Sequence, residues 1–328
     1  MERLSVVISN YNYERFVGEA IDSALALPWP DVEVVVVDDG STDNSLDVIR
    51  GYGDRVVLLA TENSSQRVAV NRGFAASTGD VVIFLDADDL LPADLPVPLS
   101  AVMGPAVSKV QFQMQRVDAS GAPLGLPFPA YDPPPPPATV RRWLLATSAY
   151  PTPPGSGNAY ARWFLDRVLP AGPEVGDAGD SALLAAAPLL GDVVSVPGVV
   201  VGYRQHGRND SNLLNDVSRF PREVARARAR WHFAQCAAGN VPANERPLFA
   251  SRELLQLRVA SRRMAPGEAP LPGDRMSRMV RDAVLSPWRP GPEPWLRRLT
   301  VAGWCLATLA APAALAQDLV RFRYGRDR

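Results

Sequence analysis

Apolar runs alternate with amphipathic helical stretches through the first hundred residues, and this alternation limits the fold more than any other feature. The apolar runs, which suit strands buried on both faces, lie at 4–8, 32–39, 55–60 and 79–86. Helices are predicted between them by apolar spacing, at 16–25, 41–49 and 66–77. Strand and helix in alternation produce a mostly parallel central sheet flanked by helices. The predicted fold class is therefore α/β.

Polar side chains follow three of these runs, where the predicted strands end. They are Ser9, Asn10 and Tyr11 after the first run, Asp38 and Asp39 after the second, and Asp86, Asp88 and Asp89 after the fourth. In open parallel sheets, ligands bind beyond the carboxyl ends of the strands. Carboxylates this close repel one another unless a cation joins them. The residues alone leave two interpretations open: solvated turns with helix caps, or a metal site that holds a phosphorylated ligand.

The composition excludes several classes of protein. A formal net charge of −1 over 328 residues gives no overall field for nucleic acid. The sequence has no G-x-G-x-x-G and no Gly-rich loop with Lys, so dinucleotide and Walker-type sites are not expected. Cys236 and Cys305 lie far apart and form neither a metal spacing nor a disulfide framework, which fits a reducing compartment. The apolar run near the N-terminus is too short for a signal peptide, so a cytoplasmic location is expected.

The pattern loosens beyond residue 90. Residues 108–118 alternate and predict an antiparallel strand, and residues 193–207 predict a pair of short strands. From about residue 215 the apolar spacing is mostly helical. We therefore expect an α/β domain over residues 1–210 and a mainly helical C-terminal extension over residues 211–328.

An uncharged run at residues 299–316 stands out near the end of the chain. Arginines bound it on both sides, namely Arg297, Arg298, Arg321, Arg323, Arg326 and Arg328. A membrane-spanning helix needs roughly 20 apolar residues, whereas this run is rich in Ala and interrupted by Pro312. Two interpretations stay open for residues 296–328. The segment packs within the protein or against another copy in a homo-oligomer, or it lies at a membrane surface with its arginines among the lipid phosphates.

Four motifs, in this order and with these gaps, resemble the inverting glycosyltransferases of family 2. They are "VVISNYN", "VVVVDDGSTDNS", "GDVVIFLDADD" and "YRQHG". The similarity is good over residues 1–95, thinner over 96–210 and absent after about 215. The resemblance implies a GT-A (Rossmann-like) fold, with a nucleotide-binding half at 1–95 and an acceptor half at 96–210.

The resemblance also implies a nucleotide site and a metal site. The residues it places at the nucleotide are Ser9, Tyr11, Asp39 and Asp86. Tyr11 would stack on the base, Asp39 would bind the base, and Asp38 would fix the loop. The residues it places at the ion are Asp88, Asp86, Asp89 and His206. The ion would be Mg²⁺ or Mn²⁺, which the DxD element holds against the diphosphate.

The general base of the family comes from an acidic residue just before a helix, and Asp180 matches it best, with Asp177 as runner-up. Two positions depart from the family pattern. Val70 stands where Arg is usual, and Arg67 is its nearest basic neighbour in the "NSSQRVAVN" stretch. Gly179 stands where an acidic residue often precedes the base.

The implied activity is transfer of a sugar from a UDP- or GDP-linked donor to the hydroxyl of a glycan, lipid-linked or small-molecule acceptor. By family habit the product would be a polysaccharide or another glycoconjugate. The two departures keep open a catalytically silent binding or scaffold protein on the same fold. A nucleotidyltransferase shares the sheet and an acidic metal site, but it would normally have a basic Gly-rich loop after the first strand, where this chain has "SNYNYERF".

Overall fold

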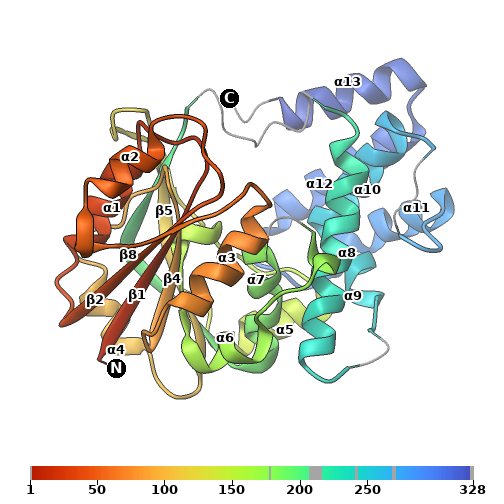
Figure 1. The fold of residues 1–328 in the computed structure, drawn as a ribbon. Coiled ribbons are helices and arrows are strands. Elements are labelled where there is room, and N and C mark those ends of the chain that lie inside the picture. Colours follow the sequence, from red (N-terminus) through yellow and green to blue (C-terminus); the bar gives the residue numbers. More distant parts are fainter. Residues whose placement is uncertain (1, 177–178, 207–215, 241–242, 268–270, 326–328) are drawn as a thin grey trace. The chain divides into compact units, whose positions relative to one another are not determined.

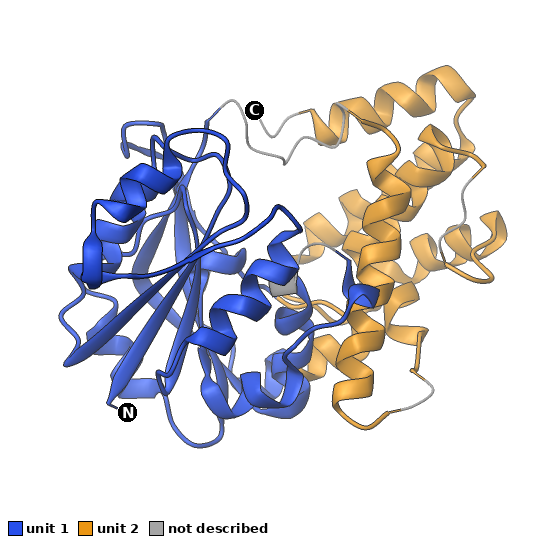
Figure 2. Ribbon diagram, viewed as in Figure 1, with its two compact units in different colours: residues 1–140, 151–207 blue, residues 141–150, 208–328 orange. Residues whose placement is uncertain are grey.

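The computed structural model describes residues 2–325 apart from 177–178, 207–215, 241–242 and 268–270. The chain forms two compact units (Figures 1 and 2). Unit 1 comprises residues 1–140 and 151–207, and unit 2 comprises residues 141–150 and 208–328. Residues 141–150 thus group with the helical part of the chain, which no sequence pattern indicated.

Unit 1 is built on one sheet whose strands follow the order β3-β2-β1-β4-β7-β5-β6, with β8 paired to β5. The four parallel strands are β1 (Arg3–Asn10), β2 (Asp31–Asp38), β3 (Val57–Ala60) and β4 (Val81–Asp86). Asn10 is in register with Asp38, and Ser9 is in register with Asp86. The carboxyl ends of β1, β2 and β4 therefore lie level with one another, as the sequence predicts.

Helices cover both faces of this parallel half (Figure 1). They are α1 (Val17–Leu25), α2 (Ser45–Arg50) and α3 (Gln66–Ala76). Val6 and Ile8 of β1 pack in one core with Ile21 of α1. A Cβ on Gly73 of α3 would lie 2.2 Å from a methyl group of Val7, so α3 lies closely on the opposite face. Successive side chains of a strand point to opposite faces, and both faces of β1 are buried.

The rest of unit 1 extends the sheet with β5 (Val107–Val117), β6 (Pro123–Phe128), β7 (Asn158–Ala161) and β8 (Asp192–Arg204), and adds α4 (Pro96–Val102), α6 (Arg162–Val168) and α7 (Gly179–Leu190). Strand β5 pairs antiparallel with β6 and β7 and parallel with β8. The prediction of two short strands at 193–207 is wrong. Gly198, at φ 87°, makes an irregularity rather than a reversal, and one strand continues through it.

The described part of unit 2 is helical, which confirms the prediction for the C-terminal extension. Its elements are the end of α5 (Pro137–Thr147), α8 (Arg219–Ala237), α9 (Arg246–Ala250), α10 (Arg252–Met264), α11 (Met276–Leu285), α12 (Trp295–Ala310) and α13 (Ala313–Tyr324). Helix α10 contacts α8, α11, α12 and α13. Its buried Leu255 and Val259 pack with Met279 of α11 and Cys305 of α12. Helix α10 is therefore the centre of this unit.

The uncharged run at 299–316 forms two helices rather than one. Helix α12 ends at Ala310, and Pro312 caps the start of α13. Within the described ranges, no helix combines the length and the apolar character that crossing a membrane requires. Part of the run packs inside the unit, since Cys305, Thr308 and Leu309 are buried.

Candidate active site

The loop after β2 is held in place by Asp38. This fully buried carboxylate accepts hydrogen bonds from the Asn10 side-chain amide at 2.7 Å, from the Ser41 backbone N–H at 2.9 Å and from the Ser41 hydroxyl at 2.6 Å. The bonds tie the ends of β1 and β2 to the first turn of the "DDGS" element. Asp38 therefore fixes the loop, which is the role that the sequence analysis gave it.

Asp39 lies beside the segment that precedes α3. Its two carboxylate oxygens accept from the Ser64 backbone N–H at 3.1 and 3.0 Å, and the Ser64 hydroxyl donates to Oδ1 at 2.8 Å. Gly40, at φ 79°, follows directly, and a Cβ there would lie 2.6 Å from the backbone nitrogen of Asn63. Only glycine allows this approach. The "DDGS" loop and residues 63–64 thus form one hydrogen-bonded wall of the site.

The predicted nucleotide contacts on β1 face the same edge. Ser9 is partly exposed and in register with Asp86, and Tyr11, which follows β1, is 45% exposed. An exposed aromatic face next to a loop of hydrogen-bonding groups is the arrangement that base stacking needs. Asn12, at φ 60°, accepts the Thr42 backbone N–H at 2.7 Å and so connects this segment to the "DDGS" loop.

The second acidic element joins β4 to β8 through a carboxylate–imidazole pair. Asp88 Oδ2 lies 2.9 Å from His206 Nε2, and both side chains are about one-tenth exposed. The His206 ring stacks on Phe16 with centroids 5.1 Å apart and meets Tyr13 edge-on at 5.6 Å. Two residues that the sequence places 118 positions apart are therefore neighbours.

Asp86 and Asp89 complete this element. The Gln66 side-chain amide donates to Asp86 Oδ1 at 2.9 Å, and the Arg204 backbone N–H donates to Asp89 Oδ1 at 3.1 Å. Burial, followed by the charges of Asp86 and Asp88, raises the pKa of Asp89 well above its usual range. Asp89 Oδ2 is buried, and hydrogen bonds from the Ser156 hydroxyl and the Arg204 backbone offset the rise in pKa only in part. The crowded negative charge is therefore not fully relieved by the protein's own donors among the described residues.

Arg204 is a site residue that sequence reasoning missed. Its fully buried guanidinium donates to the carbonyl of Asp88 at 3.0 Å, to the carbonyl of Ala119 at 2.7 Å and to Glu19 Oε2 at 2.6 Å. It also lies over the Phe16 ring, 4.8 Å from the centroid. Arg204 thus holds the acidic loop against α1 and β8. The available signal was its place in "YRQHG", two residues before His206.

The departure at Val70 has a structural explanation in α3. Val70 is 2% exposed, so it is a core residue of the helix. Arg67 points elsewhere, because its guanidinium donates to the carbonyls of Gly176 at 3.1 Å and Ala171 at 3.2 Å. Asn71 exchanges two hydrogen bonds with the backbone of Ala171, each 2.9 Å long. These side chains fasten the segment that leads into α7.

The two candidates for the general base are not placed by the structure. Asp177 lies outside the described residues, and Asp180 lies in the first turn of α7 with a side chain outside the described part. Asp180 therefore stays a prediction that rests on its position along the chain.

The residues present fit a divalent ion of the Mg²⁺ or Mn²⁺ type. Among the described residues, no group of three or more His, Cys, Asp or Glu side chains is arranged to hold a metal by itself. Mg²⁺ and chemically similar ions are commonly held by one or two carboxylates together with oxygens of a bound phosphate. The Asp88 carboxylate and the buried Asp89 carboxyl group offer hard oxygen ligands of this kind.

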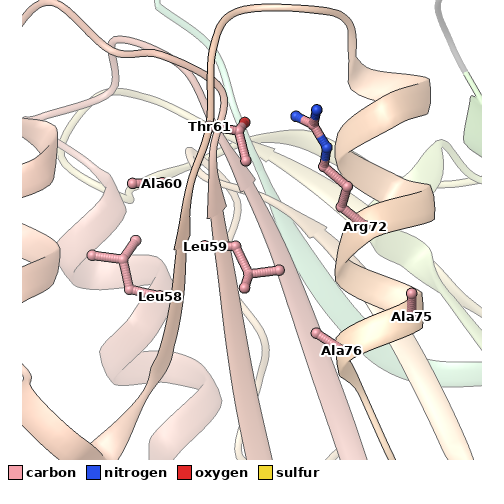
Figure 3. Close-up of a pocket in the computed structure, with 7 residues that line it drawn as sticks. All are labelled: Leu58, Leu59, Ala60, Thr61, Arg72, Ala75 and Ala76. Carbon is pink, nitrogen blue, oxygen red and sulfur yellow. The ribbon is translucent and has the colours of Figure 1, made fainter.

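A surface hollow of about 550 Å³ lies between β3 and α3 (Figure 3). It is lined by Leu58, Leu59, Ala60, Thr61, Arg72, Ala75 and Ala76. Arg72 extends from α3 toward the end of the hollow where Thr61 lies (Figure 3). The lining contains none of the predicted site residues, so the hollow does not define the site.

The fold is shared with solved glycosyltransferase structures across nearly the whole chain. A mannosyltransferase from Pyrobaculum calidifontis, PcManGT, in complex with GDP-Man and Mn²⁺, aligns with a TM-score of 0.55 at 20% identity over 97% of this chain and 84% of that chain. TarS 1-349 of S. aureus in complex with UDP-GlcNAc aligns with a TM-score of 0.55 at 14% identity over 98% and 92%. The fold class is that of GT-A glycosyltransferases.

Sequence comparison gives the family. Residues 5–103 match the model of glycosyl transferase family 2. The uncharacterized glycosyltransferase alr2836 of Nostoc is 34% identical over 234 residues, which are 69% of this chain and 71% of that protein. The uncharacterized glycosyltransferase YibD of Escherichia coli is 38% identical over 90 residues, 26% of each chain. The chain belongs to glycosyltransferase family 2, and it is a glycosyltransferase.

Proposed function

We propose that this chain is a metal-dependent, inverting glycosyltransferase that moves a sugar from a nucleotide-diphosphate donor to an acceptor hydroxyl. The observation that carries the proposal is the convergence of the "DDGS" loop, the "DADD" loop and His206 at the level carboxyl ends of β1, β2 and β4. Acidic side chains from separate strands share one edge, and a diphosphate with its cation is a ligand that makes such crowding favourable.

The donor half of the site divides into a base-binding wall and an acidic loop. Tyr11 stacks on the nucleobase, while Asp39 hydrogen-bonds it after giving up part of its bonding to Ser64. Asp88, with Asp86, Asp89 and His206 beside it, would hold the divalent ion. A cation there stabilises negative charge on the leaving diphosphate as a Lewis acid.

The acceptor half is proposed to act through Asp180. An inverting transfer needs a base on the face of the sugar opposite the diphosphate, and Asp180 lies at the start of α7. It takes the proton of the acceptor hydroxyl as that oxygen attacks the anomeric carbon. A positioned general base contributes roughly 10² to 10⁴ in rate, so Asp180→Asn is expected to keep donor binding and to lose transfer.

The donor is proposed to be a UDP- or GDP-linked sugar. PcManGT was solved with GDP-Man and Mn²⁺, and TarS with UDP-GlcNAc, so the shared fold is compatible with both bases. The product is proposed to be a polysaccharide or another glycoconjugate.

Titration of the protein with UDP and GDP, with and without Mn²⁺, tests the proposal, followed by a screen of donor-sugar hydrolysis. Metal-dependent binding and slow hydrolysis are expected. Asp88→Asn should weaken nucleotide binding only when Mn²⁺ is present. Its matched control is Asp54→Asn, which removes an exposed carboxylate in the turn before β3. The control should change neither nucleotide binding nor its dependence on Mn²⁺.

Each alternative has its own outcome. Binding without turnover of any donor sugar would indicate a catalytically silent GT-A protein. Val70 and Gly179 would then be the first residues to replace, by the Arg and the acidic residue that the family pattern has at these positions. Release of pyrophosphate from a nucleoside triphosphate would indicate a nucleotidyltransferase. Nucleotide affinity that does not depend on the metal or on Asp88 would contradict the proposed metal site.

A further inference from the structure

The two compact units carry opposite formal charges. Unit 2 contains 23 Arg and no Lys against 11 Asp and Glu, a net charge of +12. Unit 1 contains 11 Lys and Arg against 24 Asp and Glu, a net charge of −13. Together they give the 34 basic and 35 acidic residues of the chain and its net charge of −1. The neutral total therefore conceals a strongly basic unit, a charge asymmetry that favours an anionic partner.

Helix α12 of this basic unit has an outward face without charge. The exposed positions that recur at helical spacing are Leu296, Leu299, Thr300, Gly303, Ala307 and Ala310. Ala302, Cys305 and Leu309 are buried on the other side. The only charged residues in the helix are Arg297 and Arg298. A helix on the surface of a water-soluble domain normally presents charged or polar side chains outward, and α12 does not.

Two exposed tryptophans lie at the N-terminal end of this face. Trp288 is 69% exposed and Trp295 is 50% exposed, and their rings meet edge-on with centroids 5.8 Å apart. The contact joins the turn after α11 to the first residue of α12. Leu285, the last residue of α11, is 47% exposed, and Leu296 is 73% exposed. These four residues, Leu285, Trp288, Trp295 and Leu296, are called the tryptophan patch below.

Burying such side chains in a lipid headgroup region is favourable for two reasons. Tryptophan has an apolar ring and a polar N–H, and it is enriched where membrane meets water. Interfacial helices bury an apolar face about 5–10 Å into the boundary of headgroups and acyl chains, with arginines at the lipid phosphates. Arg281, whose side chain is 63% exposed, and the exposed Arg297 flank the tryptophan patch along the chain.

The charge of unit 2 decides between a lipid surface and a second copy of the chain. Two copies that met through this unit would bring together two net charges of +12, and like charges oppose that association. An anionic lipid surface instead attracts each exposed arginine within about a Debye length. Such a surface accommodates both the uncharged face of α12 and the exposed arginines that flank it.

We propose that unit 2 docks on an anionic lipid surface through the tryptophan patch and the uncharged outward face of α12. Electrostatic attraction brings the unit to the surface, and the tryptophan patch inserts between the headgroups. The helix lies along the surface and does not cross the bilayer. The inference concerns unit 2 alone and does not depend on the chemistry of unit 1.

Sedimentation of the full chain with vesicles tests the proposal. Vesicles of phosphatidylcholine mixed with phosphatidylglycerol are expected to bind the protein, vesicles of phosphatidylcholine alone to bind it far less, and raised salt to release it. The double variant Trp288→Ser/Trp295→Ser should lower the partition coefficient about 10- to 100-fold, because two large apolar side chains lose their burial. Leu126→Ser, at an 84% exposed leucine of unit 1, is the matched control and should change nothing.

Three results would overturn the proposal. Failure to sediment with the mixed vesicles would exclude an anionic lipid surface. Unchanged sedimentation of the double variant would exclude the tryptophan patch as the contact. A dimeric mass by light scattering that becomes monomeric in Leu296→Ser would assign the face to contact between copies. Since sedimentation needs no donor sugar, a chain inactive as a transferase would still give a clear result.

Discussion

Replacing Arg204 by lysine tests whether one buried cation organises the acidic loop. The guanidinium donates to the Asp88 and Ala119 carbonyls and to Glu19, and it is fully buried. A lysine keeps the charge but has one compact ammonium in place of the planar fork. It can replace one of the three bonds, so at least one buried carbonyl loses a charge-assisted donor. Such a bond contributes about 1.5–3 kcal/mol.

The pair with Glu19 adds little to this sum, because the Glu19 side chain is 54% exposed and exposed pairs contribute about 0–1 kcal/mol. We therefore expect Arg204→Lys to lower the free energy of unfolding by about 2–4 kcal/mol. Urea unfolding followed by circular dichroism measures this, and the loss should fall in the transition of unit 1. Arg50→Lys, in an exposed pair with Asp47, is the control and should stay within about 0.5 kcal/mol of the parent.

Nucleotide titration of the same variant separates an organising role from a merely structural one. If Arg204 positions Asp88 and Asp89, the variant should also bind UDP or GDP more weakly in the presence of Mn²⁺, under conditions where it is fully folded. A urea midpoint and slope equal to those of the parent would refute the reasoning, because a buried anchor cannot be exchanged without cost.

Three further changes have definite expected outcomes. Gly40→Ala should lower the unfolding free energy by about 1–3 kcal/mol, since the position has φ 79° and a Cβ would meet a backbone nitrogen at 2.6 Å. Gly53→Ala, at φ 55° with open space around it, should cost less in the same urea assay. Burial raises the pKa of Cys305 to about 12. Iodoacetamide at pH 8 should therefore label only the exposed Cys236 in the folded protein, and mass spectrometry in urea should find both labelled. The raised pKa of Cys305 also means that the free energy of unfolding falls as pH rises above about 9, because only the unfolded thiol then loses its proton. Asp282→Asn should cost about 3–5 kcal/mol by thermal or urea unfolding, since it removes a buried partner of two arginines; a smaller loss would show that the network is relaxed by water.

Much of unit 1 could be predicted from sequence because its signals are local. A strand buried on both faces reads as a continuous apolar run whatever its partner, so β1, β2 and β4 were found with their ends nearly correct. The sequence also predicted that the carboxyl ends of these strands lie level with one another, because parallel strands that alternate with helices begin and end together. This was sufficient to bring Asp39, Asp86 and Asp88 to one edge.

The missed features depend on partners far away in the chain. Pro197 and Gly198 favour a turn locally, yet β8 pairs with β5 on both sides of them, over Asp192–Ser195 and Val200–Arg204, and the chain does not reverse. The ion pair of Arg204 had no local signal, because its partner Glu19 lies 185 residues away, although the "YRQHG" motif marked the position of Arg204 itself. The role of Asp180 rests on resemblance and stays a prediction. The opposite charges of the two units became visible only once the contacts had defined the units.

The pairing of the second half of β8 with β5 limits how the chain can vary in length. The strand runs for 13 residues from Asp192 to Arg204, and His206 follows two residues later. Side chains alternate between the two faces of a strand, so removal of one residue would turn Arg204 away from the "DADD" loop. The pairing of β8 with β5 already departs from a regular ladder at two places, between Asp192 and Val193 and between Ser195 and Val200, and Gly198 lies in the second. A change in the length of this strand must therefore be absorbed at one of these two irregularities, or it will disconnect the acidic loop from the imidazole that faces it.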